Sequence, residues 1–207
     1  KMQEWQTDYL QLSAGPSRIS GIREEKFIND SMFSAQAMHL NGVQFAIYKD
    51  KRLPFKYGVI KPLPVNLLKK IPLALELDSI YIFNASIAYT EFNDKTGKEA
   101  LIYLNGTDAI IKNVHNSNFS GKDSLLLLAR TNLMDSIHLR FRFAESYIDT
   151  LAGFLMHLRA RPFDIAVMNP VLIPLASVKI KSGKVDTLQL KAIGREYIAL
   201  GAMDMYY

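Results

Sequence analysis

The side chains that could do acid–base, nucleophilic or metal chemistry are dispersed along the chain. The four histidines, His39, His115, His138 and His157, lie far apart, and none falls in an HExxH or comparable spacing of metal ligands. The chain has no cysteine, which excludes a thiolate nucleophile, a disulfide and a zinc–thiolate site. It contains no GxSxG elbow, Walker-type phosphate loop or GxGxxG fingerprint. We therefore predict that the chain is not an enzyme and uses no metal or cofactor.

Carboxylates are the remaining candidates for catalysis, and a hydrolytic pair assembled from distant positions stays open as the least favoured alternative. Most of them fall in expected turns or at strand ends, where Asp and Glu solvate the chain and cap its backbone. They include Asp94, Glu99, Asp108, Asp123, Asp135, Glu145 and Asp149. Their spacing does not select a pair.

The chain is basic, with 25 Lys and Arg against 20 Asp and Glu and a formal net charge of +5. This density is below that of a dedicated nucleic-acid binder and suits an anionic membrane surface equally well. One cluster mixes cations and aromatic rings: Tyr48, Lys49, Lys51, Arg52, Phe55, Lys56 and Tyr57. No RNP-type stacking motif accompanies it, so we predict no nucleic-acid partner and interpret these lysines as protection of a sheet edge.

The elements that must position these residues follow a period of two. Ile137, Leu139, Phe141 and Phe143 alternate with polar residues, which is typical of a strand with one dry face and one wet face. Further strands are expected at 38–49, 75–92, 100–114, 124–131, 151–159 and 195–207, and a hairpin is expected between 178–181 and 188–192. Helices are expected at 64–70 and around 163–173, the second capped by Asp164.

Short turns between long strands favour consecutive antiparallel pairing. We therefore predict a mainly β fold, a long, curved antiparallel meander sheet with one or two short helices packed on it. Residues 1–30 are expected to be an irregular lead-in with one strand near 18–24, and residues 31–207 a single β-rich domain. No apolar stretch reaches the roughly 20 residues that span a bilayer. The strand-like pattern continues to Tyr207, so we expect a piece of a longer chain.

Some strands are apolar on both faces, an excess that needs an explanation. Between 79 and 89, Ile80 and Ile82 alternate with a second apolar set, and the run of leucines at 125–128 behaves alike. One explanation is a sheet covered on both sides. The other is a sheet whose concave face holds acyl chains, because burying hydrocarbon surface contributes a favourable free energy of about 25 cal/mol per Å². The candidate lipid contacts are Ile80, Ile82, Ile137, Leu139, Phe141 and Phe143.

Three stretches carry a resemblance to a known family. They are 77–114, with the turn Thr96-Gly97-Lys98; 169–176, beginning Asn169-Pro170-Val171; and 181–207, ending in Met203-Asp204-Met205-Tyr206-Tyr207. In this order they resemble the C-terminal region of the AsmA-like family of bacterial envelope proteins, whose relatives include TamB. The resemblance covers residues 71–207, and its motifs are strand and turn patterns of low information.

The resemblance implies a non-catalytic periplasmic body that is tethered to the inner membrane of a Gram-negative bacterium. The anchor would be a segment that is not present here. It also implies phospholipid or acyl chains as ligands, in lipid transport between membranes or in outer-membrane integrity, and contacts with the remaining segments of the parent chain. The alternative function is a structural or protein-interaction module that pairs through its sheet edges with other envelope components.

Overall fold

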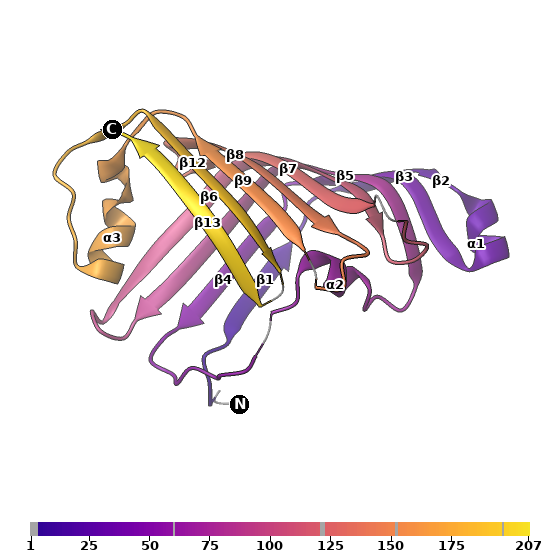
Figure 1. Ribbon diagram of the computed structural model, residues 1–207, viewed down its shortest axis with the longest axis horizontal. Coiled ribbons are helices and arrows are strands. Elements are labelled where there is room, and N and C mark those ends of the chain that lie inside the picture. Colours follow the sequence, from indigo (N-terminus) through magenta and orange to yellow (C-terminus); the bar gives the residue numbers. More distant parts are fainter. Residues whose placement is uncertain (1–3, 60, 121–122, 152, 196) are drawn as a thin grey trace.

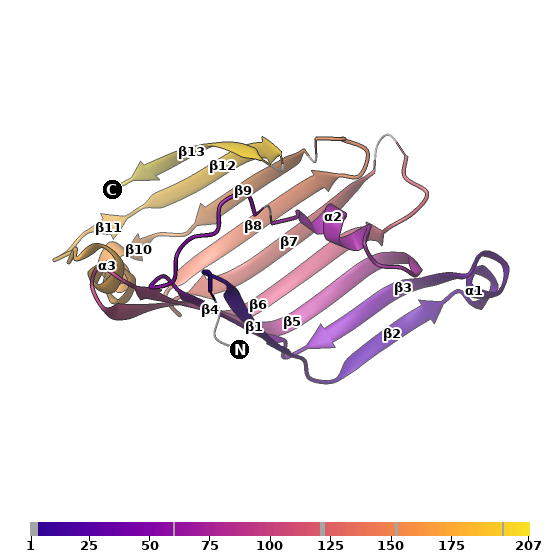
Figure 2. The ribbon, with the colours of Figure 1, turned by 90° about the horizontal axis from the view of Figure 1, so that it is seen from below.

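The computed structural model describes residues 4–59, 61–120, 123–151, 153–195 and 197–207. Eleven strands in this part of the chain form one curved sheet (Figures 1 and 2). They are β1 (Asp8–Ser13), β2 (Ser17–Ile22), β3 (Met32–Asn41), β4 (Gln44–Asp50), β5 (Ala74–Asn93), β6 (Lys98–His115), β7 (Ser124–Leu133), β8 (Ile137–Ser146), β9 (Phe154–Ala160), β12 (Thr187–Arg195) and β13 (Ile198–Tyr206). The prediction of a mainly β fold built on a long, curved sheet is confirmed.

Short helices and a two-stranded sheet complete the described structure. The helices are α1 (Glu24–Asp30), α2 (Pro64–Leu68), the 3-10 turn η1 (Ile165–Met168) and α3 (Asn169–Ala176), and β10 (Phe163–Asp164) pairs with β11 (Lys184–Val185). The predicted helices at 64–70 and 163–173 correspond to α2 and to η1 with α3. Asp164 caps η1 as expected, because its carboxylate accepts a hydrogen bond from the Ala166 amide at 2.8 Å.

The sheet is a meander from β5 onward and mixed before it. Each strand from β5 to β8 pairs antiparallel with the strand that follows it, and β12 then lies between β9 and β13. The 20-residue β5 pairs on its other side with two strands in parallel, first β3 and then β4. β2 and β1 in turn pair antiparallel with β3 and β4. The expected all-antiparallel order therefore holds only after residue 73.

Three local predictions are wrong. The expected single strand at 38–49 is two strands, since β3 ends at Asn41 and β4 begins at Gln44. The supposed irregular lead-in forms β1, β2 and α1, and both strands belong to the main sheet; residues 1–3 of that segment lie outside the described residues. The supposed strand at 178–181 is not a strand, because β12 takes β9 and β13 as its neighbours instead. There, the Asn169 side chain donates to the Ile180 carbonyl and accepts from the Ile180 amide, each at 2.8 Å, and so replaces the ladder partners of Ile180.

The helices α2, η1 and α3 pack on one face of the sheet, which we call the inner face (Figure 2). Under α2, Val65 is 2% exposed and packs with Leu77, Val114, Leu125 and Tyr147. The Glu145 carboxylate on β8 accepts a hydrogen bond from the Val65 amide at 3.0 Å. A free amide at the helix start is thereby satisfied inside the core, so the carboxylate fixes where α2 rests.

A second cluster lies under η1 at the other end of the sheet. Ile137, Leu139 and Ala160 are buried there, against the partly buried Val167 and Met168 of η1. The carbonyls of Pro174 and Leu175 in α3 accept hydrogen bonds from Thr96 Oγ1 at 2.6 Å and Asn93 Nδ2 at 2.9 Å. These contacts tie the end of α3 to the β5–β6 turn. The two helical segments therefore cover the two ends of the inner face and leave its middle between them.

Replacing Val65 tests how strongly α2 holds the first cluster. We expect Val65→Ala to lower the free energy of unfolding by about 2 kcal/mol, because it removes buried methyl groups and leaves a cavity. Leu67→Ala in the same helix is the matched control, since Leu67 is 52% exposed and its loss should change stability by no more than about 0.5 kcal/mol. Urea unfolding followed by near-ultraviolet circular dichroism measures both. Equal effects would contradict the docking of α2.

The buried Tyr147 ring should make stability depend on alkaline pH. Its hydroxyl donates to the Asn113 carbonyl at 2.5 Å, and burial raises its pKa to about 12. Because this pKa lies above that of an unfolded tyrosine, the stabilisation is complete below pH ~10 and is lost as pH rises through about 12. We expect the free energy of unfolding to fall by up to ~3 kcal/mol across that window.

In Tyr147→Phe the alkaline decrease in the free energy of unfolding should be smaller. At neutral pH this variant should be less stable by about 1 kcal/mol, because it loses the hydrogen bond. The alkaline decrease should not vanish, because burial also raises the pKa of Tyr48, Tyr89 and Tyr103. Urea titrations at pH 8 to 12 give the measurement, with Tyr57→Phe, at an 86% exposed ring, as the control for loss of a tyrosine. An unchanged slope in Tyr147→Phe would refute the assignment.

Candidate functional site

The middle of the inner face is apolar across most of the sheet. Residues directly opposite each other in an antiparallel pair point to the same face, so Ala129, Phe141, Leu158, Leu190 and Met203 form one continuous row from β7 to β13. The next row crosses Leu127, Phe143, Met156, Ala192 and Gly201. On the other side of β5, Phe45 and Ile47 of β4 lie beside Leu12 and Leu10 of β1.

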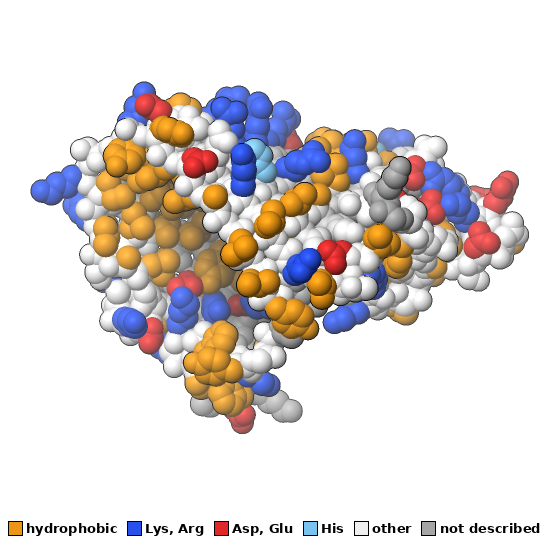
Figure 3. Space-filling view, viewed as in Figure 1, with side chains coloured by type: hydrophobic (Ala, Val, Ile, Leu, Met, Phe, Trp, Pro, Cys, Tyr) orange, Lys and Arg blue, Asp and Glu red, His pale blue; other side chains and the backbone are white. Residues whose placement is uncertain are grey.

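This apolar surface is open rather than packed. Figure 3 shows a hollow lined with hydrophobic side chains between α3 and the diagonal strand β13. Met203 on β13 is 61% exposed, and Leu10 and Leu12 on β1 are 65% and 69% exposed. The inner side chains of the central strands are half-buried. Soluble proteins seldom leave so wide a contiguous apolar face uncovered unless something binds to it.

Two left-handed residues keep the apolar side chains on this face. Asn84 in β5 has a φ of 49° and Gly106 in β6 a φ of 56°, and the register of the two strands shifts around Ala85 and Thr107. Each extra residue reverses the alternation. Ile80 and Ile82 therefore point inward before the bulge, while Ala85, Ile87 and Tyr89 do so after it. The change of face therefore explains the second apolar set after the bulge, whereas Tyr81 and Phe83 before it lie on the opposite face.

The structure places all six candidate lipid contacts on the inner face but not in equal exposure. Ile137 and Leu139 are 2% and 8% exposed and belong to the core under η1. Ile80 packs against the cluster under α2. Ile82, Phe141 and Phe143 lie half-buried between the two helical segments and belong to the open surface.

Several residues of the open surface were missed in the sequence. They lie after the bulge in β5, opposite that segment in β6, in the parallel strand β4, or in a strand of the N-terminal segment: Leu10, Leu12, Phe45, Ile47, Ile87, Tyr89 and Ile102. Asn84 and Gly106 could have indicated the bulge from the sequence, since Asn and Gly are the residues that favour a left-handed conformation inside a strand.

Charges collect at one end of the inner face. Lys51 contacts Glu91 at 2.6 Å, and the Tyr89 hydroxyl donates to the same carboxylate at 2.8 Å. Burial, followed by the bond to Glu91, raises the pKa of Tyr89. Lys61 pairs with Asp8 on the neighbouring edge. This end therefore presents paired cations and anions next to the apolar surface.

The predicted basic cluster at 48–57 is partly neutralised within itself. Arg52 pairs with Asp50 at 2.6 Å and lies over the Phe92 ring, and Phe55 packs edge-on against Tyr57. Arg52 is therefore paired within the segment, whereas Lys51 pairs with Glu91 of β5.

The histidines do not assemble a metal site in the part of the chain that the structure describes, where no group of three or more His, Asp or Glu side chains suits a metal ion. His39 stacks on Tyr81 with ring centroids 5.0 Å apart, and His115 lies 4.2 Å from the Tyr147 ring. His138 contacts Asn132.

The predicted carboxylates have local partners as well. Asp108 pairs with Arg130 at 3.0 Å, and Asp123 accepts from the Ser120 amide at 2.9 Å. Hydrogen bonds from backbone amides, of Asn84 and Ser120 respectively, lower the pKa of these two carboxyls. Glu145 holds α2, as described above.

None of the described helices is long and apolar enough to cross a membrane. Comparison of the chain with models of known protein families, with curated proteins and with solved structures gave no match. The resemblance of residues 71–207 to AsmA-like proteins therefore stays a prediction from the sequence.

Proposed function

We propose that the chain is a non-catalytic lipid-handling module that holds phospholipid acyl chains against its inner face. The observation that carries this proposal is the continuous apolar surface between α2 and α3, which reaches from Leu12 on β1 to Met203 on β13 and over which the described helices pack at the two ends. Its shape suits a flexible chain, because a curved sheet surrounds hydrocarbon on several sides.

Magnitudes favour a lipid over a small polar ligand. Each methylene that leaves water for an apolar surface gives about 0.8 kcal/mol, so ten methylenes supply roughly 8 kcal/mol before ordering costs. A polar ligand would need buried hydrogen-bonding groups, and the rows through Phe141 and Phe143 offer none. The paired charges around Glu91, Lys51, Asp8 and Lys61 suit a zwitterionic headgroup at the adjoining end.

The resemblance to AsmA-like proteins adds a setting to this proposal. In that setting the module lies in the periplasm, tethered to the inner membrane by a segment outside this sequence. There it takes part in phospholipid transport between membranes or in outer-membrane integrity. The open inner face supports the lipid part of the proposal, and the location rests on the resemblance alone.

The direct test is native mass spectrometry of protein purified from bacterial cells, combined with titration of a fluorescent phospholipid. We expect a bound phospholipid mass and saturable uptake. A clean apo mass without uptake would refute the proposal.

A pair of variants on β13 then locates the lipid. We expect Met203→Glu to weaken uptake at least about tenfold, because it places a charge beside the hydrocarbon. Leu200→Glu is the matched control on the same edge strand, since Leu200 is 67% exposed but lies on the other face. It should leave uptake within about twofold. Equal losses in both variants would contradict binding at the inner face.

A second candidate function is an interaction module that pairs through its sheet edges. All nine residues of β13 are exposed, and its outer edge has no partner strand among the described residues. Such an edge presents free amide and carbonyl groups to another strand.

The edge-pairing alternative is tested by substitution of Met205 and Tyr206, which are 36% and 67% exposed. If β13 pairs with a second copy or another strand, the double variant Met205→Ala/Tyr206→Ala should lower the weight-average sedimentation coefficient. An unchanged coefficient at several protein concentrations would argue against pairing at this edge. Leu155→Ala, an exposed apolar change on β9, is the control.

A further inference from the structure

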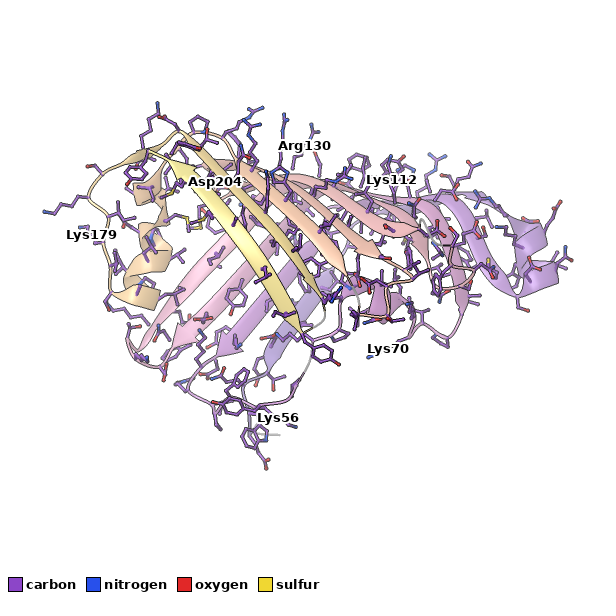
Figure 4. The ribbon with its side chains drawn as sticks, in the orientation of Figure 1. Lys56, Lys70, Lys112, Arg130, Lys179 and Asp204 are labelled. Carbon is purple, nitrogen blue, oxygen red and sulfur yellow. The ribbon has the colours of Figure 1, made fainter. Side chains whose placement is uncertain are left out.

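The outer face, opposite to the helices, carries three arginines in one row. Arg130, Arg140 and Arg159 lie directly opposite one another on β7, β8 and β9. Side chains in such positions start about 5 Å apart at their Cβ atoms, and like charges placed there destabilise a sheet. The next row adds Arg142 opposite His157. Figure 4 shows Arg130 pointing away from the sheet on the side opposite to α2. Figure 3 shows Lys and Arg side chains gathered on that side of the sheet.

These cations are mostly unpaired. Arg130 contacts Asp108 at 3.0 Å, but Arg140, Arg142 and Arg159 have no ionic partner among the described residues, and all three are exposed. His157 adds a buried Nε2 that has no hydrogen-bond partner within the same described set. One carboxylate therefore stands against four guanidinium groups, an arrangement that costs stability unless an anion joins it.

The same residues surround a depression of about 740 Å³ with an apolar floor. Tyr81 and Phe83 of β5 line it beside Ile110 of β6 and Leu128 of β7. The rings of Tyr81 and Phe83 stack with centroids 6.4 Å apart, and His39 continues the stack. The floor lies on one side of the depression and the arginines on the other, so the site is itself amphiphilic.

We propose that this depression binds a phosphate ester, with the phosphate between Arg140, Arg142 and Arg159 and the attached apolar group on the Tyr81–Leu128 floor. Phosphate is favoured over carboxylate because its oxygens can accept from several guanidinium forks at once. The site is separate from the proposed lipid surface, since the two lie on opposite faces of the sheet. Either can therefore fail without the other.

The shared chemistry is phosphate, which free phosphate or a phospholipid headgroup can supply. Calorimetric titrations of the full chain with inorganic phosphate and with soluble dihexanoyl phosphatidic acid separate the two sources. We expect the amphiphile to bind at least tenfold more tightly, because only it uses the floor. Phe83→Ala should remove most of that advantage and leave phosphate binding unchanged.

Replacing Arg140 should change stability and ligand affinity in opposite directions. Without ligand, Arg140→Gln should raise the midpoint of thermal unfolding by roughly 1–3 °C, because it removes the central charge of the row. It should also weaken both ligands about tenfold or more. Lys112→Gln, a cation on the same face of β6 that does not line the depression, is the matched control and should leave both affinities within about twofold.

Several outcomes would overturn the proposal. One is phosphate binding that Arg140→Gln and Lys112→Gln reduce equally, which indicates diffuse attraction to a basic face. Another is equal affinity for phosphate and phosphatidic acid, which removes the role of the floor. Tighter binding of a single-stranded oligonucleotide than of phosphatidic acid would assign the face to nucleic acid instead. The part of fluorescent phospholipid uptake that Met203→Glu weakens belongs to the inner face and should be unchanged in Arg140→Gln.

Discussion

The left-handed conformations of Asn84 and Gly106 are the constraint on which the rest of this structure depends. They shift the register of the long β5–β6 hairpin, so that apolar side chains before and after the bulge face the same way. Asn84 is further held because its amide donates to Asp108 at 3.0 Å. Without the bulge, Ile87 and Tyr89 would point outward, and the apolar surface would be divided between the two faces.

Once this register is set, the two faces of the sheet acquire different chemistry. The inner face gathers hydrocarbon from β1 to β13, and the outer face gathers arginine over β7, β8 and β9. Asp108 connects the two, because it holds the bulge through Asn84 and pairs with Arg130 on the outer face. A residue that shapes the backbone of the inner face therefore also sets the charge balance of the outer one.

Much of the fold could be predicted from the sequence because most strands alternate cleanly. The pattern at 137–143 defines β8, and a short turn at 93–97 defines the β5–β6 hairpin. The parallel pairing of β3 and β4 with β5 could not be predicted, because alternation reports which residues share a face and carries no information on the neighbouring strand. Three of the six expected contacts lie on the open surface. Ile137 and Leu139 are core residues, since a period of two does not reveal which part of a dry face a helix covers.

The position of α2 bears on the order in which this molecule can assemble. The helix follows β4 and precedes β5 in the chain, yet its hydrogen-bond partners lie about eighty residues later. The Val65 amide donates to the Glu145 carboxylate, and Lys69 Nζ donates to the Tyr147 carbonyl. The hairpins from β5 to β8 join close neighbours and can form early. Such long-range contacts, by contrast, must await a large loop closure. We therefore expect α2 to dock late in folding. Until it docks, the apolar surface that Val65 covers in the folded protein is exposed, and we expect the chain to be most prone to aggregation during that interval.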